Sequence, residues 1–322
     1  MRKVALCFII DHELHKEEIW KKWISCNSSL LNVYFFYKNK HLIYSNWILQ
    51  HCIPENYILP TSYFHIVPAY LALMYYAFYH DNNNTWFCFL TESCVPIIPP
   101  HVFQMMFYNN FRKSILSWKP ATWNIHLHKR ANLNLLNKKY HLCNTPWFVL
   151  ERNHVYVCIK FVELDSKMFR LICKGGIANE SIFAIILKHT NLLQYVINEN
   201  STLMDWKRMS SATSPYLFSK EEDMESIYEL IEKNKYAMFL RKIDKNFPNE
   251  LLEKILFSSL TFPFMVTLNT GHESCHGFIR GAGLHLIIST ISGMTLSTFE
   301  SISRSYYIRF AFIFCSFILC LN

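Results

Sequence analysis

The chain has 322 residues, of which 51% are hydrophobic and only seven are glycine, so it buries a substantial core in one large or two modest domains and is neither disordered nor fibrous. The net charge of +8 suits a phosphate-bearing partner, but the basic residues are dispersed in pairs rather than gathered in a stripe, which favours a nucleotide over a nucleic acid. The aromatic content of 16% indicates a crowded core more than an aromatic cleft.

Short apolar runs rich in β-branched and aromatic residues predict strands at residues 4–10 and 31–37, with an amphipathic helix between them. A buried helix with a proline near its first turn is predicted over residues 68–79, and a strand over residues 86–90 follows it. This alternation of strands and helices predicts an α/β fold with a doubly wound, mostly parallel sheet flanked by helices.

Polar residues follow the predicted strand 86–90 directly, in the segment Thr91-Glu92-Ser93-Cys94. In open α/β sheets, ligands bind in the crevice beyond the carboxyl ends of the strands. Glu92 and Ser93 are therefore candidates for binding a sugar or ribose. The alternative, that they only satisfy a tight turn, stays open.

The second half of the chain is predicted to begin with a helix after Pro100 and a basic, histidine-bearing surface loop over the cleft at residues 119–139. A strand and then a helix are predicted over residues 147–162. From about residue 255 the patterning loosens. We therefore expect one domain over residues 1–258 and a poorly patterned extension over residues 259–322.

Neither end of the chain contains a run long enough to span a membrane. The apolar run at residues 4–10 leads into acidic residues and is expected to be a strand, not a signal peptide or anchor. The run at residues 310–321 is shorter than the roughly 20 residues of a spanning helix. We expect residues 306–322 to form a buried or amphipathic end, with membrane association through a short tail anchor as the alternative.

The cysteine and histidine patterns predict no metal site and no bound cofactor. Eleven cysteines are too sparse for a disulfide scaffold, and no Cys-x-x-Cys pair is present to hold zinc. His272, Cys275 and His276 are interpreted as part of a polar loop. His12 and His15 do not have the spacing of the zinc-protease helix motif.

Glu180 is the candidate general base. Two glycines, Gly175 and Gly176, lead to an apolar helix that Asn179 is suited to cap, which places Glu180 in the first helical turn. There the helix dipole favours the ionised carboxylate that a base needs. Acidic residues are also common at helix starts without any function, and that alternative stays open.

Two further segments carry candidate binding residues. Trp206, beside Asp205, follows a strand-like run and can stack on a sugar face, although ordinary partial burial explains it equally well. Arg241 and Lys242 follow the apolar run 236–240, where two cations can neutralise a diphosphate without a metal. A solvated strand end is the alternative for this pair.

The order of these segments resembles the core-2/I-branching β-1,6-N-acetylglucosaminyltransferase family, including its plant branch. Residues 90–96 (LTESCVP) resemble the family's Leu-Ser-Glu-Ser-Cys-Pro segment, and residues 147–152 retain its Trp and Leu-x-Arg pattern. The other similar segments are ANES at 178–181, MDW at 204–206 and FLRKID at 239–244. The resemblance covers roughly residues 3–245.

The resemblance implies a GT-A-like fold and an inverting, metal-independent transfer of a sugar from a UDP donor to a glycan hydroxyl. The sugar would be N-acetylglucosamine or a pentose. The absence of an Asp-x-Asp motif after strand 86–90 agrees with metal independence. The residue roles that we expect are these: Glu180 as the catalytic base, Lys242 and Arg241 as donor-phosphate-binding residues, and Trp206, Glu92, Ser93, Asp205 and Trp147 as sugar- or acceptor-binding residues.

The sequence departs from the family pattern at two positions. Asn179 replaces an aspartate, and Ser214 precedes Pro215 where relatives often have a basic residue. These changes allow an alternative function, a catalytically decayed protein that binds a nucleotide sugar or glycan. The sequon Asn179-Glu180-Ser181 also overlaps the proposed base, and a glycan there would obstruct it. Relatives are usually Golgi proteins with an amino-terminal anchor, which we do not find in this sequence, so the compartment stays open.

Overall fold

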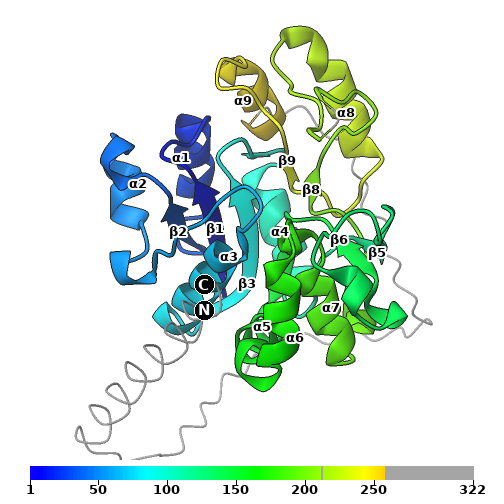
Figure 1. Ribbon diagram of the computed structural model, residues 1–322. Coiled ribbons are helices and arrows are strands. Elements are labelled where there is room, and N and C mark those ends of the chain that lie inside the picture. Colours follow the sequence, from blue (N-terminus) through cyan, green and yellow to red (C-terminus); the bar gives the residue numbers. More distant parts are fainter. Residues whose placement is uncertain (212, 258–322) are drawn as a thin grey trace, which may run out of the picture. The chain divides into compact units, whose positions relative to one another are not determined.

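The core of the molecule is a four-stranded sheet in the order β2-β1-β3-β7 (Figure 1). The computed structural model describes residues 1–211 and 213–257. β1 (Lys3–Ile10) pairs in parallel with β2 (Leu31–Tyr37) and β3 (Asn84–Thr91), and β7 (Val149–Glu151) pairs antiparallel with β3 at one edge. The predicted α/β fold, a doubly wound and mostly parallel sheet flanked by helices, is confirmed.

Side chains that alternate along β3 bind helices to both faces of the sheet. The helices nearest the sheet are α1 (Glu17–Ser25), α2 (Asn46–His51), α3 (Val67–His80), α4 (Pro100–Asn110) and α5 (Arg152–Leu164). Trp86 packs against Phe107 of α4, with 5.5 Å between ring centroids. Phe89, which points to the other face, packs against Tyr70 of α3 at 5.3 Å. α3 also contacts α5, so these two helices cover the same face.

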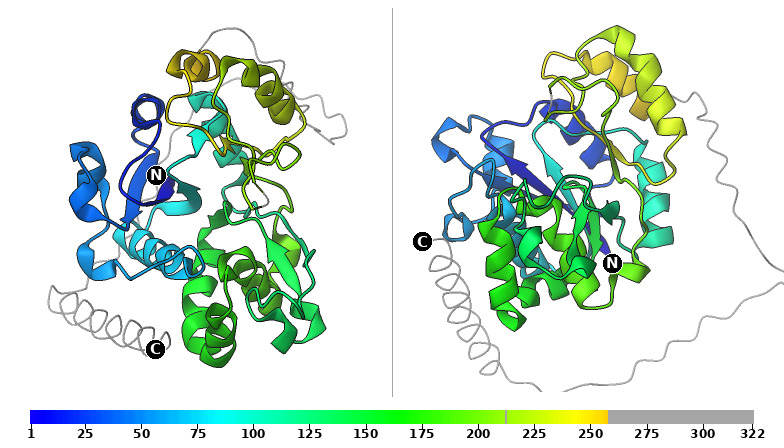
Figure 2. Two further views of the ribbon diagram at one scale, coloured as in Figure 1. Left: turned by 45° about the horizontal axis from the view of Figure 1, so that its top comes forward. Right: turned by 45° about the vertical axis from the view of Figure 1, so that its right-hand side comes forward.

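The short strands of the second half join distant segments near the end of β3. The remaining elements are β4 (Val95–Pro96), β5 (Trp118–Pro120), β6 (Leu142–Asn144), α6 (Ser166–Lys174), α7 (Ile182–His189), β8 (Thr202–Leu203), α8 (Met224–Glu232), β9 (Phe239–Leu240) and α9 (Asn249–Phe257). β4 pairs antiparallel with β9, and β9 pairs in parallel with β8. α8 and α9 lie at the end of the unit opposite α5 and α6 (Figure 2). The segment after β3 is thereby held beside the segment that precedes Arg241.

Most predicted boundaries agree with the structure to within a few residues. The predicted loop 119–139 begins within β5 and contains two short 3-10 turns, at Leu133–Leu135 and Lys138–Tyr140. Within the described ranges, no helix is long and apolar enough to cross a membrane. Those ranges also contain no group of three or more side chains that could hold a metal ion.

The predicted extension 259–322 lies outside the described residues, and so do the apolar tail 306–322 and the segment with His272, Cys275 and His276. Residues Met1–Ser258 form one compact unit. The assignment of the following residues to a separate extension stays a prediction.

A buried polar network joins β7 and α5 to the loop before β5. The Ser114 hydroxyl accepts a hydrogen bond from the Glu151 N–H at 2.8 Å, and its oxygen also forms a hydrogen bond of 2.7 Å with Nδ1 of His154. Burial lowers the pKa of His154 from 6.5 to about 4, so the imidazole is neutral near pH 7. Ser114 is 0% exposed, so no substrate reaches this Ser-His-Glu arrangement, and it is structural.

The network makes stability depend on pH. The unfolded chain protonates His154 near its ordinary pKa of 6.5, whereas the folded chain resists protonation until about pH 4, so folding free energy is lost as the pH falls between these values. We expect this histidine to cost about 2 kcal/mol of stability between pH 7 and pH 5. His154→Gln should remove that part of the slope in urea unfolding at the two pH values. Parallel slopes in the two proteins would contradict this assignment.

Candidate functional site

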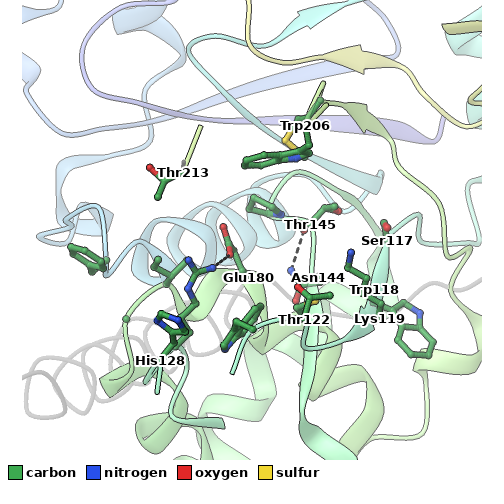
Figure 3. Close-up of a pocket in the computed structure, with 18 of the residues that line it drawn as sticks. Ser117, Trp118, Lys119, Thr122, His128, Asn144, Thr145, Glu180, Trp206 and Thr213 are labelled. Atoms are coloured by element: carbon green, nitrogen blue, oxygen red, sulfur yellow. Dashed lines mark hydrogen bonds and ion pairs between the residues drawn. The ribbon is translucent and has the colours of Figure 1, made fainter. Parts of the chain in front are cut away.

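A cavity of about 1040 Å³ is lined by segments that are far apart in the sequence (Figure 3). Its walls come from the turn with Tyr63 and Phe64, the segment 117–130 that includes β5, the end of β6, the turn before α7 and the segment after β8. Of the predicted site residues, Glu180 and Trp206 line it. The remaining predicted residues are not in its lining, and their positions are described below.

Glu180 pairs with one arginine, Arg130, and is influenced by the charge of a second, Arg241. It ends the 3-10 turn Ala178–Glu180, and its Oε2 accepts a hydrogen bond from Nη1 of Arg130 at 3.4 Å. The Glu180 and Arg130 side chains are 34% and 36% exposed. Burial raises the pKa of Glu180, while the charges of Arg130 and Arg241 lower it. The result is a partly buried carboxylate that is more basic than an exposed one and is kept ionised by the two neighbouring cations.

The predicted helix cap was wrong, and Glu180 lies in the 3-10 turn before α7 and not in the first turn of that helix. Ser181, not Asn179, precedes α7, and the first turn of the helix is capped from another element, because Oδ1 of Asn144 in β6 accepts the Ala184 N–H at 3.2 Å. Nδ2 of Asn144 also donates to the backbone oxygen of Asn179 at 2.9 Å. Asn179 is only 7% exposed, so in the folded chain the sequon at Asn179 is not presented for glycosylation.

A close backbone crossing fixes Arg130 beside Glu180. The Ala131 N–H donates to the Gly176 oxygen at 3.0 Å, and both Ala131 and Asn132 have positive φ angles, of 51° and 49°. A Cβ atom on Gly175 would lie 2.3 Å from the backbone nitrogen of Asn132, a distance that only glycine allows. The 129–132 part of the predicted loop 119–139 is therefore anchored to the segment that carries the candidate base.

Asp205 shapes the loop that presents Trp206. Its Oδ1 accepts the backbone N–H groups of Lys207 and Arg208 at 2.9 and 3.1 Å, and its Oδ2 accepts Nε of Arg208 at 2.7 Å. Trp206 is 49% exposed and lines the cavity. Protein donors bind both carboxylate oxygens of Asp205, so this residue stabilises the loop. The exposed indole ring of Trp206 remains available for contact with a ligand.

Glu92 and Ser93 lie in a tight turn after β3. The Cys94 N–H donates to the Thr91 oxygen at 3.0 Å, and the Thr91 hydroxyl bonds to the Glu92 carboxylate. The Ser93 side chain is buried, and its Oγ has no hydrogen-bond partner among the described residues. The Ile243 N–H donates to the Ser93 oxygen at 3.0 Å, which ties this turn to the segment containing Arg241 and Lys242.

Arg241 is a partly buried cation without an ion-pair partner in the described part of the chain. Its guanidinium lies 5.3 Å from the ring centroid of Trp147, which is itself buried and stacked on Tyr70. Nε of Arg241 is buried and forms no hydrogen bond within residues 1–211 and 213–257. Lys242 also forms no ion pair with the residues described. Two adjacent cations with unused hydrogen-bond donors favour the binding of an anion.

Lys16 and His15 hold the segment that follows these cations. Lys16 is buried, and its Nζ donates to the oxygens of Lys245, at 2.7 Å, and Phe247. Burial lowers the pKa of Lys16. The His15 ring contacts the Ile243 oxygen at 3.1 Å. Two polar residues that follow β1 thus form hydrogen bonds to the backbone of the segment after Lys242.

Sequence reasoning missed three residues that organise the site: Arg130, Asn144 and Lys16. The basic stretch around Arg130 was predicted as a loop over the cleft, which was a usable signal for its position but not for its contact with Glu180. Asn144 and Lys16 carry no local signal, because an asparagine before a proline-containing turn and a lysine among charged residues both resemble ordinary surface positions.

Comparison with known families places these residues in context. The model of the core-2/I-branching enzyme family matches residues 4–228, more than two thirds of the chain. The matched region contains Glu92, Glu180 and Trp206 and ends before Arg241 and Lys242. A comparison with curated proteins gave no significant match.

Substitution of Gly175 tests whether its close backbone contact with Ala131 and Asn132 fixes the position of Arg130. Gly175→Ala forces a Cβ into backbone atoms of Asn132 and should destabilise the protein by about 1–3 kcal/mol while displacing Arg130. Gly176→Ala is the matched control, since its Cβ would meet only the flexible Phe64 side chain at 3.3 Å. Thermal and urea unfolding of the two variants provide the measurement. Equal stability in both variants would show that the crossing does not constrain the loop.

Proposed function

The chain belongs to the core-2/I-branching enzyme family, which makes it a glycosyltransferase with a GT-A-like fold, and on that premise we propose an inverting, metal-independent transfer of a sugar from a UDP donor to a glycan hydroxyl. The transferred sugar is N-acetylglucosamine or a pentose. The observation that carries the proposal is the partly buried Glu180 carboxylate in a cavity, compensated by Arg130 and near Arg241.

Glu180 is the proposed general base. Among the described residues that line the cavity it is the only acidic one, so a hydroxyl that enters has one carboxylate to accept its proton. Burial makes this carboxylate more basic, and the arginine charges keep it ionised before the reaction. As the acceptor oxygen bonds to the anomeric carbon, its proton passes to Glu180.

The leaving group is the diphosphate of the donor. The bond between the anomeric carbon and the phosphate oxygen breaks on the face opposite the attacking oxygen, and UDP takes the electron pair. Arg241 and Lys242 are the proposed residues that neutralise this charge, since neither has an ion-pair partner in the described ranges and Nε of Arg241 has no hydrogen-bond partner there. Two protein cations there supply what a divalent metal ion supplies in other transferases.

The other predicted residues receive roles from their positions. Glu92, in the turn tied to Ile243, is proposed to bind the ribose or the donor sugar, whereas Ser93 is as buried as Ser114 and is assigned to the turn itself. Trp206 is the proposed acceptor platform, and Asp205 positions it. Trp147 supports Arg241 from one side of the guanidinium.

The departures from the family pattern favour one alternative function. With Asn179 in place of an aspartate, Glu180 is the single carboxylate of the turn 178–180, and Ser214 contributes no positive charge to the binding of the donor phosphates. A protein with these changes can bind a nucleotide sugar or a glycan without turnover.

The proposed base is tested by the release of UDP from a panel of UDP-sugars, measured in EDTA. Glu180→Gln should lower the rate by a factor of about 10² to 10⁴, because without an added acceptor water attacks the donor, and an amide cannot accept its proton. Glu199→Gln is the control, since it removes one charge at an exposed position outside the cavity lining. If no donor turns over while UDP still raises the melting temperature of the wild type, the non-catalytic alternative is correct.

Arg130 is expected to set the pH range of the reaction. Removing its charge in Arg130→Gln takes away a cause that lowers the pKa of Glu180, so the acid limb of the kcat/KM profile should move to higher pH while the plateau above it is retained. Arg130→Lys keeps the charge and should leave the limb near its wild-type position. An unmoved limb in Arg130→Gln would mean that the arginine does not act on Glu180.

A further inference from the structure

The walls of the cavity carry more positive charge than the single acidic residue requires. Among the described lining residues, Lys119, Lys129 and Arg130 are cationic and Glu180 is the only anion. Lys119 and His128 lie to either side of Glu180 in the close-up of the cavity (Figure 3). The described lining residues therefore carry a net positive charge.

Only one of these cations is compensated by the protein. Arg130 pairs with Glu180 at 3.4 Å and lies 5.2 Å from the ring centroid of Trp123. Lys119 and Lys129 have no ion pair within residues 1–211 and 213–257, and both are exposed. A neutral sugar that covers these ammonium groups removes water from them without replacing their interactions, whereas an anionic group replaces water with charge-assisted hydrogen bonds.

The donor diphosphate does not account for these lysines. The two cations proposed to bind it, Arg241 and Lys242, follow β9 and do not line the cavity. Lys119 lies in β5, and Lys129 lies just before the crossing at Ala131. Lys119 and Lys129 therefore supply positive charge beyond what the leaving diphosphate requires.

Exposed aromatic rings at the same cavity indicate a sugar rather than a peptide as the ligand. Tyr63, Phe64 and Trp206 line it and are 70%, 53% and 49% exposed. Tyr63 and Phe64 are presented by a turn in which Ser62 and His65 exchange two backbone hydrogen bonds. Flat apolar rings beside hydrogen-bonding groups are the usual partners of pyranose faces.

We propose that the acceptor is an acidic glycan whose carboxylate or sulfate groups are bound by Lys119 and Lys129. This inference rests on the proposed transferase function and names its acceptor class. Glu180 would take the proton of the reacting hydroxyl, the aromatic rings would bind the sugar faces, and the two lysines would select for charge.

The test compares three glycans that share one backbone and differ in charge. Unsulfated chondroitin hexasaccharide carries carboxylates only, carboxyl-reduced chondroitin sulfate carries sulfates only, and carboxyl-reduced unsulfated chondroitin is neutral. Isothermal titration in the presence of UDP, at low and at raised salt, should show binding at least about tenfold tighter for one or both anionic forms than for the neutral one. The anionic form that binds identifies whether carboxylate or sulfate is recognised, and added salt should reduce the difference.

The lysines are tested in the same titration. Lys119→Gln/Lys129→Gln should bring the anionic glycans down to the affinity of the neutral one. Lys138→Gln/Lys139→Gln is the matched control, because these lysines belong to the same basic stretch but do not line the cavity. Equal affinity for charged and neutral glycans would overturn the proposal, as would an equal loss in both variants. Equally tight, lysine-dependent binding of a poly-glutamate peptide would also overturn it, since the site would then not select a glycan.

The outcome is separable from that of the proposed function. UDP release by the wild type and Glu180→Gln reports on catalysis and needs no acceptor, whereas the titration reports on charge selection and needs no turnover. Loss of the charge preference with UDP release intact rejects the acidic acceptor alone. Charge-selective binding without UDP release rejects the transfer and leaves an acidic-glycan-binding protein.

Discussion

A carboxylate that is partly removed from water stays ionised only where the protein supplies compensating positive charge, and the candidate site depends on that balance at Glu180. Burial raises the pKa of this residue, and Arg130 and Arg241 lower it. The two arginines come from segments more than 100 residues apart on the chain, so the balance exists only in the folded protein.

Backbone contacts rather than large apolar surfaces hold the three groups in place. The crossing of Gly175 with Ala131 and Asn132 fixes the Arg130 side, where any side chain on the glycine would collide with the neighbouring backbone. On the Arg241 side, β9 pairs with β4, and the Ile243–Ser93 hydrogen bond continues that pairing to the end of β3. The central sheet therefore determines where the candidate donor-binding cations lie, although it contributes none of them.

The departure at Asn179 has a structural context that the sequence does not reveal. Asn179 is buried, and its backbone oxygen is held by Asn144, which also caps the first turn of α7. Among the described residues Glu180 thus remains the single carboxylate that lines the cavity, and its electrostatic environment comes from arginines instead of from a second acid. Family membership establishes a glycosyltransferase, while the charges of this particular cavity bear on which acceptor it uses.

The sequence by itself determined the sheet and its flanking helices, because the spacing of apolar residues reports directly on which face of a strand or helix is buried, as Trp86 and Phe89 illustrate. It also predicted Glu180 and Trp206 as site residues, through local motifs and their order along the chain, and both line the cavity. Only the tertiary structure decided that Arg130 pairs with Glu180, that Asn144 caps α7 and that Lys16 holds the segment after Lys242. These are single contacts between residues separated by 50, 40 and 229 positions, and no local period or propensity encodes a contact at such a distance.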